Sequence, residues 1–254
     1  IKDIAENELT EAEIAFFISA VYEKDMSLRE TKDLISAMIE SGSKLRLRGK
    51  VADKHCVGGV AGNRTTPIVI SICTTTGLVM PKTSSRAITS AAGTADTIET
   101  LAKVDFSVKE IKKILRKTKA CFVWGGTLGL APADDKIIKV GRIMKIDPTA
   151  QLLASILSKK ISVDSKYVLI DIPFGKSAKV SKRQAEKLKI KFLSLGKKFD
   201  IKLEVVLTDG SHPIGRGVGP VLEMRDVIKV LRRDKDAPKD LEEKSIMLSG
   251  RILE

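Results

Sequence analysis

Aromatic residues and histidines are scarce in this chain. Phe, Trp and Tyr make up 4% of its 254 residues, which is too few for a protein that binds single-stranded nucleic acid by stacking bases on aromatic rings. The two histidines, His55 and His212, do not stand at metal-ligand spacing with other ligands, so we expect no metal site. Apolar runs of membrane-spanning length are also missing, so we expect no membrane partner.

Cysteine is rare too, with Cys56, Cys73 and Cys121 and no CxxC pair. An odd count without such a pair argues against a disulfide framework and favours a reducing compartment. We therefore expect a cytoplasmic protein. Cys56 stands among glycines with only His55 beside it, which favours a small loop residue over a catalytic nucleophile.

The two ends of the sequence suggest a piece of something longer. The start, Ile1-Lys2-Asp3, is no signal peptide and lacks an initiator Met, and the end at Glu254 falls inside a periodic pattern. We therefore expect a fragment of a longer chain.

Positive charge is in excess, with a formal net charge of +13. Such a balance is typical of nucleic-acid-binding proteins, but the lysines are scattered along helical faces, as in KEIKK at 109–113. We interpret most of the charge as a solvated surface, with some excess serving a polyanionic small substrate.

Two helical patterns open the sequence, at 10–24 and 27–40. Thr10 with Glu13 and Ser27 with Glu30 form capping boxes ahead of apolar residues at spacings of three and four, and Gly42 ends the second pattern. These signals predict a helical hairpin.

From residue 51 short apolar runs alternate with helical periodicity, which is typical of a layered, largely parallel α/β sheet. Strands are expected at 51–53, 78–80, 121–124, 167–172 and 203–207, and helices at 67–75, 95–102, 108–117, 181–199 and 220–232. A block at 133–160 breaks the alternation with two helical patterns split by Asp147-Pro148.

The fold class predicted from these patterns is α/β. We expect a large α/β domain with a central, mostly parallel mixed sheet, a small all-helical domain, and a ligand cleft between them. The helical domain would comprise residues 1–48 and 133–164, and the α/β domain residues 49–132 and 165–254.

Two loops rich in glycine or hydroxyl residues each stand between an expected strand and an expected helix. The first reads DKHCVGGVAGNRTTP at 53–67, with Thr66 suited to an N-cap and Pro67 to the first helical turn. The second reads PKTSSRAITSAAGTADTIE at 81–99. Backbone N–H groups, hydroxyls and a helix start in one place suit an anion, although ordinary βα turns share this composition.

Both loops resemble the pyrimidine-type nucleoside phosphorylase family, which comprises thymidine and pyrimidine-nucleoside phosphorylases and archaeal AMP phosphorylases. The matching segments are KHCVGGVAGNRTT at 54–66, SSRAITSAAGTADTIE at 84–99 and SILSKK at 155–160. The order of helical and α/β segments matches as well, so the resemblance covers nearly the whole chain. It implies transfer of a pentosyl group from a base to inorganic phosphate, with no metal or organic cofactor.

Two departures favour AMP phosphorylase within this family. Where thymidine phosphorylases have a run like SGRGLGHTGGT, this chain has SSRAITSAAGT without the histidine, and Val140 replaces their pyrimidine-gripping arginine when the chains are aligned on SILSKK. The resemblance therefore implies phosphorolysis of nucleoside 5′-monophosphates, in which AMP and phosphate give adenine and ribose 1,5-bisphosphate. The preference among AMP, CMP and UMP stays open.

The resemblance also implies the site residues. Those implied for phosphate binding are Lys54, Thr65, Ser84 and Thr94, and those implied for substrate binding are Gly59, Ser85, Arg86, Ala87, Ile88, Thr89, Ser90, Thr94, Ser155 and Lys179. Ammonium, hydroxyl and loop N–H groups are suited to phosphate. Simpler interpretations stand beside these: an N-cap for Thr94, turn hydrogen bonds for Ser84 and Ser85, a surface salt bridge for Arg86, and a solvated loop lysine for Lys179.

Asp147 is the proton donor that the resemblance implies for the leaving base. Its own context favours a helix N-cap, because Pro148 follows it. Capping hydrogen bonds to the carboxylate would lower its pKa and make it a worse proton donor, whereas a buried cleft would raise the pKa again. Ser155 follows two helical turns later and is expected to face the same cleft.

Three alternative functions remain open. They are a thymidine or pyrimidine-nucleoside phosphorylase, an anthranilate-type phosphoribosyltransferase that uses Mg²⁺ and pyrophosphoryl ribose, and a basic nucleic-acid-binding protein with steeply salt-dependent duplex binding. As partners we expect a small-molecule nucleotide and phosphate, no nucleic acid, and a second copy of the chain in a homodimer through the opening helices, or a larger homo-oligomer.

Overall fold

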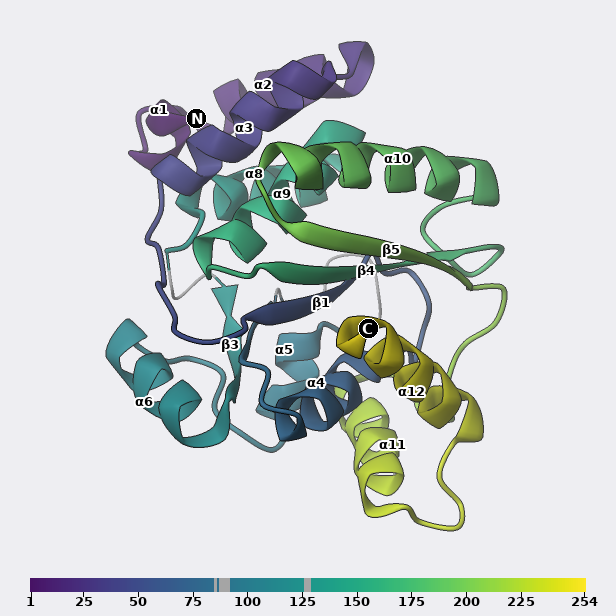
Figure 1. Ribbon diagram of the computed structural model, residues 1–254. Coiled ribbons are helices and arrows are strands. Elements are labelled where there is room, and N and C mark those ends of the chain that lie inside the picture. Colours follow the sequence, from purple (N-terminus) through teal and green to yellow (C-terminus); the bar gives the residue numbers. More distant parts are fainter. Residues whose placement is uncertain (85, 87–91, 126–128) are drawn as a thin grey trace. The chain divides into compact units, whose positions relative to one another are not determined.

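The computed structural model describes residues 1–84, 86, 92–125 and 129–254 (Figure 1). The chain divides into a helical unit, Ile1–Leu47 with Gly125–Ser165, and an α/β unit, Arg48–Trp124 with Lys166–Glu254. The first α/β segment thus ends before the expected boundary at residue 132. The reason is that Gly129 and Leu130 pack on the end of the helical hairpin: the Ser43 N–H donates to the Gly129 carbonyl at 2.8 Å, and Gly42 faces the Leu130 carbonyl.

The helical unit contains α1 (Lys2–Ala5), α2 (Glu11–Lys24), α3 (Leu28–Glu40), α8 (Pro132–Met144) and α9 (Thr149–Ser162). The predicted starts of α2 and α3 are confirmed, because Thr10 and Ser27 form capping boxes with Glu13 and Glu30. α2 packs on α8, and α3 packs on α9. Their shared core includes the buried side chains Ile14, Ile18, Leu34, Ile35, Leu153 and Leu157.

In the described part of the chain, the α/β unit has five strands: β1 (Ala52–Cys56), β2 (Met80–Ser84), β3 (Ala120–Trp124), β4 (Tyr167–Phe174) and β5 (Lys202–Asp209). They form a sheet of order β1-β4-β5 and a two-stranded sheet of β2 and β3, and each of these pairings is parallel. A parallel bridge between Val51 and Val79 links the two sheets where one continuous sheet was expected. The predicted α/β class with parallel strands is confirmed.

The helices of the α/β unit are α4 (Thr65–Thr75), α5 (Thr94–Glu99), α6 (Val108–Thr118), α10 (Lys182–Lys198), α11 (Pro220–Arg232) and α12 (Lys239–Leu253). Figure 1 shows α10 on one face of the β1-β4-β5 sheet, with α4 and α12 on the other. The core between α4, α12 and the strands includes Val69, Cys73, Leu169 and Leu248. Helix α12 was not predicted from the sequence.

Two expected element boundaries are wrong by a few residues. Helix α4 begins at Thr65, with Arg64 at the N-cap position instead of Thr66. The reason is that the hydroxyls of both threonines accept hydrogen bonds from the Lys54 ammonium. Strand β2 continues through Pro81 to Ser84, where a loop was expected. Proline is tolerated there because, among the described residues, β2 pairs with β3 alone beyond the bridge from Val51 to Val79, and a strand with one partner leaves alternate N–H groups unpaired.

Candidate functional site

Three loops of the α/β unit follow the carboxyl ends of parallel strands. Residues 57–64, which we call the glycine loop, follow β1; residues 175–181 follow β4; and residues 85–93, of which 86, 92 and 93 are described, follow β2. β1 pairs with β4, and the bridge from Val51 to Val79 places β2 on the other side of β1. Because parallel strands present their carboxyl ends at one edge, this edge is the usual place for a ligand in such a fold.

Gly59 of the glycine loop and Lys179 of the loop after β4 lie in direct contact. Gly59 has φ +97°, and a Cβ atom at this position would lie 2.3 Å from the Lys179 nitrogen. Such a distance leaves room for glycine alone. The structure therefore brings together two residues that were predicted to bind substrate.

Arg64 ties the glycine loop to two further segments. Its Nη1 donates to the Thr94 hydroxyl at 3.0 Å, its Nη2 donates to the Ala92 carbonyl at 2.9 Å, and its Nε donates to Glu223 Oε2 at 2.7 Å. Arg64 and Glu223 are both buried. The N-cap interpretation of Thr94 is wrong, because Gly93 holds that position and Thr94 is the first residue of α5. Sequence reasoning missed the role of Arg64, and its place inside a glycine-rich loop was the available signal.

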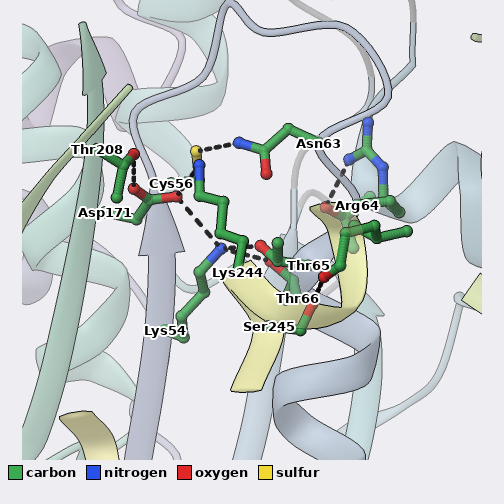
Figure 2. A network of polar contacts seen from close by, with 12 residues as sticks. Lys54, Cys56, Asn63, Arg64, Thr65, Thr66, Asp171, Thr208, Lys244 and Ser245 are labelled. Carbon is green, nitrogen blue, oxygen red and sulfur yellow. Dashed lines mark hydrogen bonds and ion pairs between the residues drawn. The ribbon is translucent and has the colours of Figure 1, made fainter. Parts of the chain in front are cut away.

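Lys54 lies fully buried on β1, within a polar network (Figure 2). Its Nζ donates to the hydroxyls of Thr65 at 2.7 Å and Thr66 at 3.3 Å, and lies 3.9 Å from Asp171 Oδ2. Burial lowers the pKa of Lys54, although the Asp171 carboxylate acts in the opposite direction. The structure thus joins Lys54 to Thr65, the second predicted phosphate ligand of this segment.

A second lysine, Lys244 of α12, reaches the same network. Its Nζ lies 3.4 Å from Asp171 Oδ2, and Figure 2 shows its tip beside the thiol of Cys56. The other oxygen of Asp171 accepts a hydrogen bond from the Thr208 hydroxyl at 2.6 Å, and the Asn63 amide donates to Cys56 Sγ at 3.4 Å. Burial raises the pKa of Cys56 to about 11, which keeps the thiol protonated near neutral pH. Sequence reasoning missed Lys244 together with its helix.

Arg86 is engaged by acidic residues of α5. Its guanidinium donates to Asp96 at 3.2 Å and to Glu99 at 3.0 Å, and lies 5.0 Å from the centre of the Trp124 ring. These contacts agree with the interpretation of Arg86 as part of a salt bridge. Its contact with substrate stays a prediction. Ser84 is the last residue of β2 and is half-buried. The other predicted residues of this segment, Ser85, Ala87, Ile88, Thr89 and Ser90, lie outside the described residues.

The helical unit holds a second polar cluster, centred on the buried Asp134 of α8. This carboxylate accepts hydrogen bonds from Gln151 at 3.1 Å, Ser155 at 2.8 Å and Lys159 at 2.5 Å, all from one face of α9. Burial by itself lowers the pKa of Lys159, but Asp134 and Asp135 outweigh it, so the pKa is raised. Ser155 was predicted to bind substrate, whereas Asp134 and Lys159 were missed.

Asp147 stands just before α9, and its side chain is exposed. Its interpretation as the helix cap is wrong, because α9 begins at Thr149 and Pro148 occupies the N-cap position. Its predicted role as a proton donor stays a prediction.

Two features are absent from the described residues. Over residues 1–84, 86, 92–125 and 129–254, no group of three or more His, Cys, Asp or Glu side chains is placed to hold a metal ion. In those same ranges, none of the helices is both long and apolar enough to cross a membrane.

The fold is similar to that of anthranilate phosphoribosyltransferases. The enzyme from Thermus thermophilus matches with a TM-score of 0.76 and 15% identity, over 99% of this chain and 82% of that chain. The enzyme from Saccharomyces cerevisiae, in complex with PRPP and Mg, matches with a TM-score of 0.59 and 16% identity, over 78% of this chain and 52% of that chain. At such identities the likeness shows the fold alone.

The chain belongs to the glycosyl transferase family. Residues 48–190 match the family model described as "Glycosyl transferase family, a/b domain", and residues 1–42 match the model of its helical bundle domain.

Several relatives carry the name "Putative thymidine phosphorylase". The one from Ralstonia nicotianae is 50% identical over 100% of this chain and 50% of its own length. The one from Hahella chejuensis is 46% identical over 100% of this chain and 51% of its own length. The predicted kinship with thymidine and pyrimidine phosphorylases is thus confirmed. This chain spans about half the length of the curated relatives it matches.

Proposed function

We propose that this chain is the phosphate-binding and nucleotide-binding part of a pentosyltransferase that cleaves nucleoside 5′-monophosphates with inorganic phosphate. A phosphate oxygen attacks C1′ of the ribose, and the N-glycosidic bond breaks. Its electron pair leaves with the base, which takes a proton from Asp147. With AMP the products are adenine and ribose 1,5-bisphosphate, and the reaction uses no metal or organic cofactor.

One observation carries this proposal: the three loops at the carboxyl ends of β1, β2 and β4 are joined to one another. The glycine loop meets the loop after β4 where Gly59 contacts Lys179. It meets the segment after β2 where Arg64 holds Thr94. Glycine backbone, hydroxyls and cations gathered at one edge are what a phosphate requires.

The choice of a monophosphate over thymidine rests on Val140. This residue occupies the position of the pyrimidine-gripping arginine, and in α8 it is buried, with 3% of its surface exposed. A buried valine offers no hydrogen-bond donor to a pyrimidine carbonyl. This substitution supports a substrate that is recognised by its 5′-phosphate.

Thymidine phosphorolysis is the second candidate, because the relatives from Ralstonia nicotianae and Hahella chejuensis carry that name. Purified protein should be incubated with phosphate and AMP, CMP, UMP or thymidine in the presence of EDTA. We expect ribose 1,5-bisphosphate from the monophosphates and no product from thymidine. Release of deoxyribose 1-phosphate alone would favour the second candidate, and activity only with anthranilate, pyrophosphoryl ribose and Mg²⁺ would refute both.

The proton donor is tested by Asp147→Asn. We expect phosphorolysis to fall by about 100-fold or more, because general acids contribute on that order. Asp164→Asn, the same chemical change just after α9 in the helical unit, serves as the control. Activity of the Asp147→Asn variant within about threefold of the parent would remove Asp147 from the mechanism.

We further propose a cytoplasmic homodimer that associates through the opening helices. Its support is that α2 exposes Phe16 to 76% and Tyr22 to 59%, and that the cysteines of the chain are free thiols. Sedimentation of a Phe16→Asp variant should show a monomer where the parent sediments as a dimer.

A further inference from the structure

We propose that Lys244 is a second cationic ligand of the orthophosphate subsite, acting beside Lys54. The proposal rests on the proposed phosphorolysis and names a binding residue for its nucleophile. Lys244 comes from α12, close to the end of this chain and far in sequence from both phosphate-binding loops.

The Lys244 ammonium has unused hydrogen-bonding capacity. Its side chain is 9% exposed, yet among the described residues its Nζ has no hydrogen-bond partner. The nearby Asp171 Oδ2 also has no hydrogen-bond partner among the described residues. It forms an ion pair with Lys244 Nζ at 3.4 Å. A lysine ammonium carries three N–H donors, and buried polar groups are almost always satisfied. We therefore infer that the unpaired N–H groups of Lys244 bind an acceptor that does not belong to the chain.

The charges around Lys244 do not balance. With both lysines protonated, Lys54 and Lys244 share the single carboxylate of Asp171, while Arg64 is matched by Glu223. Cys56 adds no negative charge near neutral pH, because burial raises its pKa to about 11. With both ammonium groups charged, one positive charge is in excess in a buried place, which is unfavourable unless an anion joins it. The lowered pKa of Lys54, which burial causes, has the same origin.

The position of the ammonium fits a ligand of the glycine loop. Figure 2 shows the tip of Lys244 beside Cys56, and Asn63 of the glycine loop donates a hydrogen bond to Cys56, the residue just before this loop. Within the loop, Gly58, Gly59 and Gly62 have positive φ angles, and residues without a Cβ atom allow the backbone to approach an anion closely. The Lys244 ammonium thus lies where the glycine loop begins, and this loop is suited to binding oxyanions.

Asn63 narrows the choice of anion. Its Oδ1 is a buried acceptor with no hydrogen-bond partner among the described residues. An unused donor on Lys244 and an unused acceptor on Asn63 match an ion that both accepts and donates hydrogen bonds. Monohydrogen phosphate does both, whereas sulfate accepts only. We therefore expect orthophosphate to bind more tightly than sulfate.

Phosphate binding to the parent and to Lys244→Met should be measured by isothermal titration calorimetry, with sodium sulfate as the competing anion. We expect the variant to bind phosphate at least about tenfold more weakly, because it loses a charge-assisted hydrogen bond. Lys239→Met, the same change at an exposed position of α12, should stay within about twofold. The melting temperature of Lys244→Met without phosphate should equal or exceed that of the parent, because the unbalanced buried charge is gone.

Unchanged phosphate affinity of Lys244→Met would overturn the proposal, and so would a parent that binds no phosphate. Should the variant fail to fold, a phosphate-soaked crystal of the parent decides: an oxygen within about 3.2 Å of Lys244 Nζ supports the assignment, and phosphate bound elsewhere refutes it. Phosphate binding through Lys244 without any ribose 1,5-bisphosphate formation would refute the proposed function and leave this inference standing.

Discussion

The Arg64 guanidinium and the Thr94 hydroxyl are joined by a hydrogen bond of 3.0 Å, although thirty positions separate them in sequence. The same guanidinium forms a buried ion pair with Glu223 of α11. One side chain therefore fixes the glycine loop against the start of α5 and against α11. The geometry of the proposed phosphate site depends on this arginine even if it never touches the ligand.

Removing the Arg64 side chain should lower the free energy of unfolding. Arg64→Met leaves the buried carboxylate of Glu223 without its ion-pair partner, and breaking such a pair costs about 3–5 kcal/mol. Urea denaturation should show a loss of this size, while Arg225→Met at an exposed position of α11 stays close to the parent. The double variant Arg64→Met with Glu223→Leu should regain part of the loss. A double variant as unstable as the single one would contradict this account.

The contact between Gly59 and Lys179 allows a matched comparison of two glycines. Gly58 and Gly59 share φ +97°, but a Cβ atom would lie 2.3 Å from backbone at Gly59 and meets nothing within 4 Å at Gly58. Gly58→Ala should cost about 1–2 kcal/mol, the strain of a left-handed backbone. Gly59→Ala should cost more and should also weaken phosphate binding. Equal losses of stability in urea denaturation would show that the contact with Lys179 is unimportant.

Asp135 should make stability depend on pH. Burial raises its pKa above the usual value, Lys159 opposes this shift and Asp134 adds to it. The folded state therefore holds this proton more tightly than the unfolded state, and stability falls as pH rises from the unfolded pKa near 3.8 through the folded pKa. Asp135→Asn should be more stable than the parent at pH 7, and the difference should vanish near pH 3. Asp105→Asn, at an exposed position, should show no such pattern.

The thiols should resist alkylation in the folded protein. Burial raises the pKa of Cys56 and Cys73 to about 11 and that of Cys121 to about 12. At pH 8 about one thiol in a thousand or fewer is then a thiolate, which is the reactive form. Iodoacetamide followed by intact-mass measurement should find little label before unfolding and three labels after it. Rapid labelling of Cys56 in the folded protein would contradict its raised pKa.

The predictions that rest on residues close together in the sequence are confirmed. The capping boxes at Thr10 and Ser27 involve residues three positions apart, so their geometry is determined within one helical turn. The parallel strands also follow from their apolar runs. By contrast, α12 was missed because its buried face alternates Leu241 and Leu248 with Ser245 and Ser249, which interrupts the apolar stripe that identifies a helix.

Contacts of the candidate site were predicted only where both residues belong to the same segment of the sequence. Lys54 and Thr65 lie eleven residues apart and meet, as their shared motif indicated. Glu223 and Lys244 come from distant helices, and no local pattern marks a buried ion pair or a buried ammonium. The predicted Thr66 cap is wrong for a different reason, because Lys54 of the preceding strand donates a hydrogen bond to the Thr66 hydroxyl.

The helical unit is assembled from two stretches, Ile1–Leu47 and Gly125–Ser165, with the first α/β segment between them. On the ribosome, α2 and α3 emerge long before α8 and α9, the helices against which they pack. The apolar side of the hairpin, with Ile14, Ile18, Leu34 and Ile35, stays in water for that whole interval. The nascent chain thus exposes an apolar surface during much of its synthesis. Such a surface is prone to aggregation, and we expect a chaperone to bind the hairpin at this stage.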